Sequence, residues 1–222
     1  MLCGGVDSLS LLTINGFASL EVVSGRVTKP FAADREGINI GEAAAVFLMT
    51  RAPMPGFPEG EPIGLLGYGA SSDAWHMSSP RPDGEGAMQA IQAALQGAGL
   101  SAGDLGWINL HGTGTAQNDA MESLAVVQTL GADVPGTSTK PHTGHTLGAA
   151  GALEAAIVWG LVSRQLNPSG ALLAQGNERD PSLAPLRLTR SGDRWPSGRR
   201  LGLSTSFAFG GNNMALIMGD TA

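Results

Sequence analysis

Three polar, glycine-rich turns hold the residues whose types and spacing could do chemistry. "KPHTGHTLG", from Lys140 to Gly148, places one lysine and two histidines within six positions, although the whole chain has four histidines. "HGTGT" begins at His111, and "SFAFGGNN" begins at Ser206. Imidazoles that converge on one point could donate hydrogen bonds to a carbonyl oxygen as it gains negative charge. A lysine nearby would add positive potential.

Each pattern also has a plainer interpretation. A histidine that follows a strand is usually a hydrogen-bonded structural residue. His142 and His145 could bind a metal ion together, but no acidic or thiol ligand has a suitable spacing, so we expect neither a metal nor another cofactor. Phe207 and Phe209 alternate as residues do on one face of a core strand. The residues alone therefore indicate a polar, histidine-lined crevice and leave its reaction open.

The elements that must position these turns alternate between strand and helix patterns. The first residues, "MLCGG", are expected to be the end of a buried strand. We expect further strands at 43–49, 63–72, 105–112, 200–209 and 213–219, the last two paired as a terminal hairpin. Helices are expected at 14–23, 84–99, 118–131 and 148–163. Asn118 or Asp119 is the expected N-cap of the third helix. This alternation predicts a layered α/β domain, in which loops that leave the same sheet edge meet in one crevice. His111 and His145 could then face one reacting atom.

The composition limits the class of protein and its surroundings. Of 222 residues, 42% are hydrophobic and 14% charged, and the formal net charge is −6, which favours neither nucleic acid nor an anionic membrane surface as a partner. The single cysteine, Cys3, excludes an intramolecular disulfide. No apolar run suits a membrane span and no signal-peptide pattern is present, so we expect a cytoplasmic protein.

Five arginines cluster near the C-terminal end, and they are Arg187, Arg190, Arg194, Arg199 and Arg200. Their neighbours are Ser, Gly, Asp and Pro, which is typical of an exposed connection. We favour a solvated loop there over a patch that binds an anionic partner. Further upstream, the four prolines of "APMPGFPEGEP" break both helix and sheet, and predict a linker at 54–61.

Taken together, the motifs resemble the β-ketoacyl-acyl carrier protein synthases of the decarboxylating two-histidine type, in the thiolase superfamily. The segments that carry the resemblance are "PFAADREGINIGEAAAVFLM", "INLHGTGTAQNDAMES", "STKPHTGHTLGAAG" and "STSFAFGGNN". Thiolases with a second cysteine and synthases with a His-Asn pair match less well. The resemblance implies a thiolase-like αβαβα fold, with the tail of the N-terminal half at 1–53 and the complete C-terminal half at 62–222.

The resemblance also implies roles for five residues around the predicted reaction centre. His111 and His145 would bind the carbonyl of a malonyl thioester and stabilise the enolate that forms as carbon dioxide leaves. Lys140 would act electrostatically beside the second histidine. Asp119 and Glu122 would belong to the surrounding shell of ion pairs and hydrogen bonds. His142 matches no catalytic role.

Another five residues would contact the substrate if the resemblance holds. Thr113 and Thr115 match threonines that contact the phosphopantetheine arm. Phe209, with Phe207 beside it, matches an aromatic gate near the acyl tunnel. The amides of Phe209 and Gly210 lie where an oxyanion hole is expected.

The family's cysteine nucleophile would lie upstream of Met1, and Cys3 belongs to a strand that follows it. We therefore expect this chain alone to catalyse neither acyl transfer nor condensation. The implied partners are acyl carrier protein bearing acyl and malonyl groups on phosphopantetheine, and a missing N-terminal half or partner subunit, in a dimer. The alternative is a non-catalytic subunit of the chain-length-factor kind. Ala208 stands where the family has a glycine before the gate phenylalanine.

Overall fold

The computed structural model describes residues 1–51 and 63–221. Its main sheet has five strands in the order β3-β7-β6-β4-β5, where β4 runs parallel to β5 and β6, and β7 runs antiparallel to β6 and β3. The strands are β3 (Ile63–Ser72), β4 (Trp107–Asn109), β5 (Gly136–Thr137), β6 (Leu201–Ala208) and β7 (Asn212–Asp220). A mixed sheet between helices confirms the predicted α/β class.

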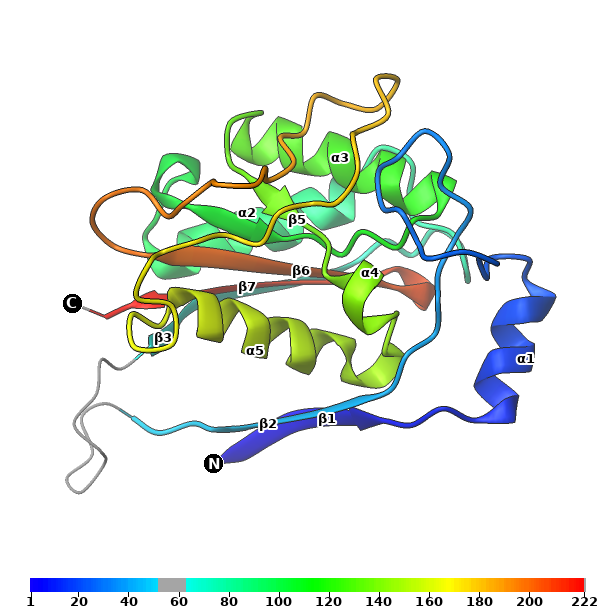
Figure 1. Cartoon of the computed structure of the whole chain (residues 1–222), viewed down its shortest axis with the longest axis horizontal. Helices are drawn as coiled ribbons and strands as arrows, with labels where there is room; N and C mark the ends of the chain where they lie inside the picture. The colour runs from blue at the N-terminus through cyan, green and yellow to red at the C-terminus, as the bar shows by residue number, and fades with distance from the viewer. Residues whose placement is uncertain (52–62, 222) are drawn as a thin grey trace.

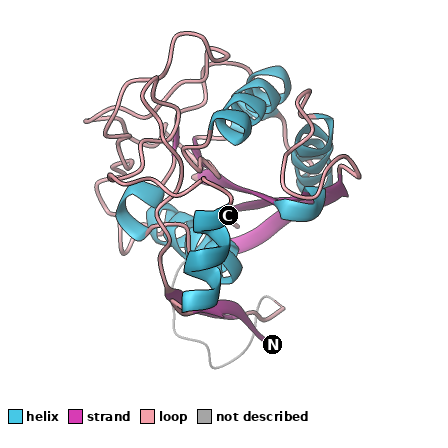
Figure 2. Ribbon diagram, turned by 90° about the vertical axis from the view of Figure 1, so that its right-hand side faces the viewer, coloured by secondary structure: helices cyan, strands magenta, loops and turns pink. Residues whose placement is uncertain are grey.

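Helices cover both faces of this sheet (Figures 1 and 2). On one face lie α2 (Glu85–Ala98) and α3 (Ala116–Leu130), and on the other lies α5 (Ala150–Val162). Beyond α5 is a separate antiparallel ribbon of β1 (Leu2–Asp7) and β2 (Ala43–Leu48), and α1 (Leu11–Ser19) extends from its end. Among the described residues, no helix combines the length and the apolar character that crossing a bilayer requires.

Small residues allow the helices to lie close to the sheet. A Cβ atom at Gly67 or Gly69 of β3 would lie 2.2 or 2.0 Å from a backbone carbonyl oxygen of α2. The side of α2 that meets the sheet is built from alanine together with Ile91 and Leu95, all buried. On the opposite face, Val158 and Val162 of α5 pack in a second cluster with Trp107 and Trp195. Both layers around the sheet are therefore tightly packed.

Most of the predicted elements are present, with shifted ends. The strands predicted at 43–49 and 63–72, the terminal hairpin, and the helix ending on left-handed Gly99 are confirmed. The strand predicted at 105–112 is shorter, and α1 begins earlier than expected, after the N-cap Ser10. A short helix, α4 (Lys140–Thr143), was not predicted. The predicted linker at 54–61 lies outside the described residues.

Two local predictions are wrong. The N-cap of α3 is Thr115 and not Asn118 or Asp119, because the Asp119 carboxylate already accepts two backbone amides elsewhere. The first strand, expected to be the end of a buried one, alternates between exposed and half-buried residues. It therefore has one uncovered face in this chain.

Candidate functional site

The two catalytic candidates lie on neighbouring loops at one edge of the main sheet. His111 follows β4 after a single intervening residue, Leu110, and Lys140 and His145 follow β5. Because β4 and β5 are parallel neighbours, both chains leave the sheet at the same edge. The imidazole rings of His111 and His145 meet edge to face, with centroids 5.4 Å apart and planes at 85°. The structure therefore brings the predicted pair together.

Lys140 lies beneath this pair with its ammonium group enclosed by protein atoms. Its side chain is 1% exposed. Nζ lies 3.4 Å from Nδ1 of His111, donates to the backbone carbonyl of His111, and forms an ion pair with Glu154 of α5. An ammonium group has three hydrogens, so these contacts account for all of them.

Glu154 was missed by the sequence reasoning. It is the one charged residue of α5, in a helix made otherwise of small and apolar residues, and its side chain is 2% exposed. A lone acidic residue on a buried helix was the available signal, because a buried charge is rarely left without a partner. Burial raises the pKa of Glu154, and the positive charge of Lys140 acts against that rise.

Both imidazoles are neutral near pH 7. Burial, aided by the positive charge of Lys140, holds the pKa of His111 well below its usual range and lowers the pKa of His145 to about 3. Nδ1 of His145 accepts the amide hydrogen of Leu147 at 3.2 Å, and Nδ1 of His111 faces the ammonium group, which can only donate. These partners assign the ring hydrogen to Nε2 in each residue.

Glu122 and Asp119 hold the first histidine loop from below. Glu122 accepts the amides of His111 and Gly112, both at 2.7 Å. Asp119 accepts the amide of Gly114 at 3.1 Å. Burial raises the pKa of Glu122 to about 7 and that of Asp119 to about 6. Both carboxyls thus act on the backbone of this loop, while the ion-pair partner of Lys140 is Glu154.

Thr205 of β6 is a second residue that sequence reasoning missed. Its hydroxyl donates to Glu122 at 2.9 Å and accepts the amide of His111 at 3.1 Å. Thr113 and Thr115 have hydroxyl oxygens 2.9 Å apart. Thr113 is buried and Thr115 half-buried, so Thr115 presents the more accessible hydroxyl.

The two phenylalanines of the third turn have different surroundings. Phe207 is buried, and its ring meets His111 edge to face with centroids 5.9 Å apart. Phe209 is 43% exposed and stacks on Phe17 of α1 at 5.8 Å. Phe207 therefore forms a wall of the histidine site, and Phe209 links the turn to α1.

One of the two amides of the predicted oxyanion hole, that of Gly210, is engaged within the protein. The Gly210 amide donates to the carbonyl of Met77 at 2.8 Å, so that donor becomes available to a ligand only when this hydrogen bond breaks. Ala208 has extended backbone angles, φ −101° and ψ 161°, which an alanine adopts without strain. The methyl group at this position is therefore compatible with the observed turn.

The other polar candidates lie apart from the pair. His142 is exposed on α4, and Cys3 is half-buried on β1. Within the described part of the chain, no group of three or more His, Cys, Asp or Glu side chains is arranged to hold a metal ion.

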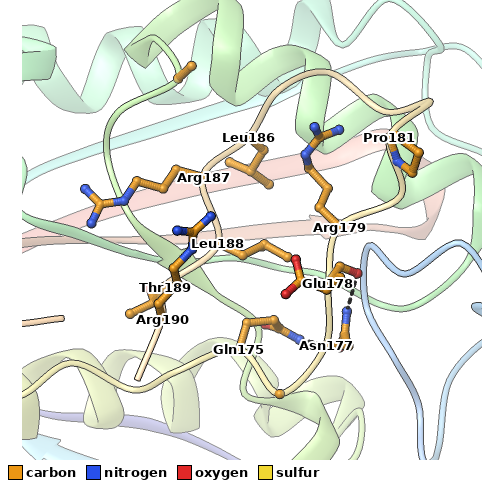
Figure 3. Close-up of a pocket in the computed structure, with 12 residues that line it drawn as sticks. Gln175, Asn177, Glu178, Arg179, Pro181, Leu186, Arg187, Leu188, Thr189 and Arg190 are labelled. Atoms are coloured by element: carbon orange, nitrogen blue, oxygen red, sulfur yellow. Dashed lines mark hydrogen bonds between the residues drawn. The ribbon is translucent and has the colours of Figure 1, made fainter. Parts of the chain in front are cut away.

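A cavity of about 490 Å³ lies among the loops that precede β6, and neither histidine lines it (Figure 3). Arg187 and Arg190 are among its walls, and Arg187 forms an ion pair with Asp193 at 3.1 Å. Arg200 departs from the predicted solvated loop, because it is buried and donates to the carbonyl of Asn167 at 2.8 Å.

Comparisons with known proteins identify the family of this chain. The family described as "Beta-ketoacyl synthase, C-terminal domain" matches residues 64–171. The 3-oxoacyl-acyl-carrier-protein synthase 2 of Synechocystis is 34% identical over 97% of this chain and 53% of the relative, and that of Mycobacterium tuberculosis is 32% identical over 98% and 54%. The chain thus spans about half the length of these relatives.

Solved structures agree with these sequence matches. A chain of the complex between a ketosynthase and its chain length factor from Xenorhabdus doucetiae is 48% identical, with a TM-score of 0.89 over 99% of this chain and 53% of that chain. A β-ketoacyl synthase from Burkholderia phymatum is 31% identical, with a TM-score of 0.79 over 100% and 55%. The fold and site therefore define a thiolase-like α/β protein. The chain belongs to the β-ketoacyl synthase family and corresponds to the C-terminal half of its members.

Proposed function

We propose that this chain supplies the decarboxylating half of a β-ketoacyl-acyl carrier protein synthase active site, an acyltransferase of fatty acid or polyketide-type synthesis. The observation that carries the proposal is the pair of neutral imidazoles, His111 and His145, with ring centroids 5.4 Å apart and Nδ1 of each already occupied. Each ring then has one Nε2–H donor, and the ring of His111 also forms a hydrogen bond with the backbone of Phe207. Two such donors suit one oxygen that becomes negatively charged.

The proposed step is loss of carbon dioxide from a malonyl thioester. The bond between the carboxylate and the α-carbon breaks, and its electron pair forms the carbon–carbon double bond of an enolate. The π electrons of the thioester carbonyl move to its oxygen at the same time. Hydrogen bonds from His111 and His145 strengthen as charge develops on that oxygen, so they stabilise the transition state more than the substrate. The enolate carbon would then attack an acyl thioester held on a cysteine outside this chain.

An uncovered apolar surface supports a partner chain or segment. In the β1–β2 register, Leu2 lies opposite Leu48, and Gly4 lies opposite Val46. Leu2, Val46 and Leu48 are all exposed, and they share one face of the ribbon with Val6. Contiguous apolar surface of this kind usually marks an interface. The proposed occupant is the N-terminal half of the synthase fold, as part of a longer polypeptide or as a partner subunit, in a cytoplasmic dimer.

Acyl carrier protein is the proposed carrier of the acyl and malonyl groups. Solved relatives are described as a ketosynthase with its chain length factor, and as a ketosynthase in complex with an acyl-carrier protein. The half-buried Thr115 hydroxyl and the Phe209 ring are the proposed contacts to the phosphopantetheine arm and the acyl chain.

Reconstitution tests this function. The chain is co-expressed with the cysteine-bearing N-terminal half of a related synthase, and release of carbon dioxide from malonyl-acyl carrier protein is measured. We expect His111→Ala and His145→Ala to lower the rate by about 10²–10³-fold. His142→Ala is the matched control, because His142 is exposed nearby, and it should leave the rate unchanged. Full activity in His111→Ala or His145→Ala would refute the proposal.

The same experiment distinguishes the proposed catalytic role from a second candidate function, that of a non-catalytic subunit of the chain-length-factor kind. Two solved relatives combine a ketosynthase with such a factor, which favours keeping this candidate. It predicts that both histidine variants keep the rate of the active partner while product length changes.

The purified 222-residue chain alone should transfer no acyl group, and acyl transfer by it would contradict that expectation.

A further inference from the structure

One segment, residues 28–41, forms hydrogen bonds with the loops of both histidines. At its first contact, the Gly37 amide donates to the carbonyl of Gly114 at 2.9 Å. The Thr28 hydroxyl donates to the carbonyl of Gly37 at 2.6 Å and also lies 3.3 Å from the carbonyl of Thr113. Thr113 and Gly114 lie two and three positions after His111 in the same loop. This part of the segment therefore holds the first histidine loop through its backbone.

The second contact is made to His145 itself. Its amide donates to the carbonyl of Asn39 at 2.6 Å, and its carbonyl accepts the amide of Gly41 at 3.0 Å. Ile40 and His145 thereby form an isolated parallel bridge. Both backbone groups of His145 are thus fixed by three consecutive residues, which set the position of its Cα atom.

The Asn39 side chain joins these two contacts. Its Oδ1 accepts the amide of Thr28 at 2.7 Å. Thr28, which lies beside the first histidine loop, is therefore hydrogen-bonded to Asn39, which binds His145. Its Nδ2 donates to the carbonyls of Arg26 at 2.9 Å and Ser24 at 3.2 Å. Asn39 is half-buried, and its amide thus has partners for both donor hydrogens and for the acceptor.

We infer that Asn39 is a positioning residue that sets the spacing of His111 and His145 by linking the backbones of their two loops. A short path connects them. It runs from the His111 loop through Gly37 and Thr28 to the Asn39 side chain, and from the Asn39 carbonyl to the amide of His145. The importance of Asn39 for catalysis rests on the proposed function, whereas the hydrogen-bonded link between the two loops does not. A displacement of about 1 Å between two groups that act on one atom can cost about 10²-fold in rate.

Nuclear magnetic resonance of the full chain with isotope-labelled histidine tests the link without measuring activity. In Asn39→Ala, we expect the His145 amide to exchange with solvent about tenfold faster, because its acceptor is no longer held. We also expect the pKa of His145 to rise by about one unit as the ring gains water, and contacts between the two rings to weaken. His76, which is exposed, is the internal reference and should not change.

Two further variants separate positioning from general stability. Asn167→Ala is the matched control, because Asn167 is also a half-buried loop asparagine that bonds to two backbone carbonyls, at Leu161 and Ala171. It should lower stability without changing the His145 signals. Asn39→Asp keeps the acceptor for Thr28 and loses both donors, so contacts between the two rings should persist.

Unchanged amide exchange and ring contacts of His145 in a folded Asn39→Ala chain would overturn the inference. So would equal His145 changes in Asn39→Ala and Asn167→Ala. If Asn39→Ala does not fold, loss of the ring contacts in Asn39→Asp would overturn it, and their persistence would support it. None of these outcomes depends on the proposed reaction, which the reconstituted histidine variants test separately.

Discussion

Replacing Lys140 by methionine removes the cation that joins α5 to the first histidine loop. Methionine keeps most of the side-chain length and removes the charge. The Glu154 carboxylate then loses its ion-pair partner while still buried, and its second oxygen already has no hydrogen bond within the described residues. His111 also loses the donors to its carbonyl and to Nδ1.

The expected loss of stability is large. An uncompensated charge at a buried site costs about 3–5 kcal/mol, against a total free energy of unfolding of about 5–15 kcal/mol for most domains. A double variant, Lys140→Met with Glu154→Met, removes both charges and fills the space with apolar atoms. We expect it to recover most of the loss, because well-packed apolar replacements of buried ion pairs are often neutral.

The pKa of Glu154 determines how the loss of stability in Lys140→Met changes with pH. Burial raises the pKa of Glu154, and removing Lys140 removes both causes that lower it. A folded-state pKa above the unfolded value means that the folded chain keeps its proton longer, so stability is retained at low pH and lost as pH rises toward the folded pKa. The deficit of Lys140→Met should therefore be larger at pH 8 than at pH 5.

Urea unfolding followed by circular dichroism measures these differences for the wild type, the single variant and the double variant. With the slope typical of proteins this large, the single variant should lose about 1–2 M in unfolding midpoint at pH 8. A deficit below about 1 kcal/mol, or a double variant no more stable than the single one, would refute the reasoning.

Two other predictions concern the first histidine loop. Burial raises the pKa of Glu122 from 4.5 to about 7, so its ionisation costs stability as pH rises across that interval. Glu122→Gln should remove this part of the pH dependence in urea unfolding, and an unchanged slope would contradict the assignment. Gly112 has φ +37°, and an added Cβ would lie 2.5 Å from that of Ser138, so Gly112→Ala should lower thermal stability by about 2 kcal/mol or more. Gly160→Ala in α5 is its control, because a Cβ there meets nothing within 4 Å and alanine favours the helix.

The sequence allowed prediction of residues whose chemistry is local. Alternating strand and helix patterns predicted the α/β class, and the rule that neighbouring parallel strands end at one edge predicted that His111 and His145 would meet. The prediction of Asn118 or Asp119 as the N-cap of α3 was wrong, because Asp119, a good capping residue, instead accepts the amides of Phe31 and Gly114. A propensity rule does not register a competing partner 88 positions away.

The positioning residues were harder to predict for the same reason. Asn39 contacts His145 through its backbone carbonyl, a group that every residue has, so its side-chain type gives no signal. The lone charge of Glu154 on an apolar helix signals that it has a partner, but that partner is identified only when α5 is known to lie against the histidine loops. Contacts of this kind depend on the packing of distant segments and not on local pattern.

The geometry of Lys140 also decides how it could assist the proposed reaction. A lysine that bound the malonyl carboxylate would need a free N–H directed at the substrate, yet this ammonium group is enclosed and all its hydrogens meet protein atoms. A direct ion pair would moreover stabilise the carboxylate before it is lost as carbon dioxide, which opposes decarboxylation. In the proposed reaction, Lys140 would instead act through His111, because its charge disfavours a second cation on the ring and directs the ring hydrogen to Nε2. Both effects leave the two imidazoles neutral donors, which is the state an enolate oxygen requires.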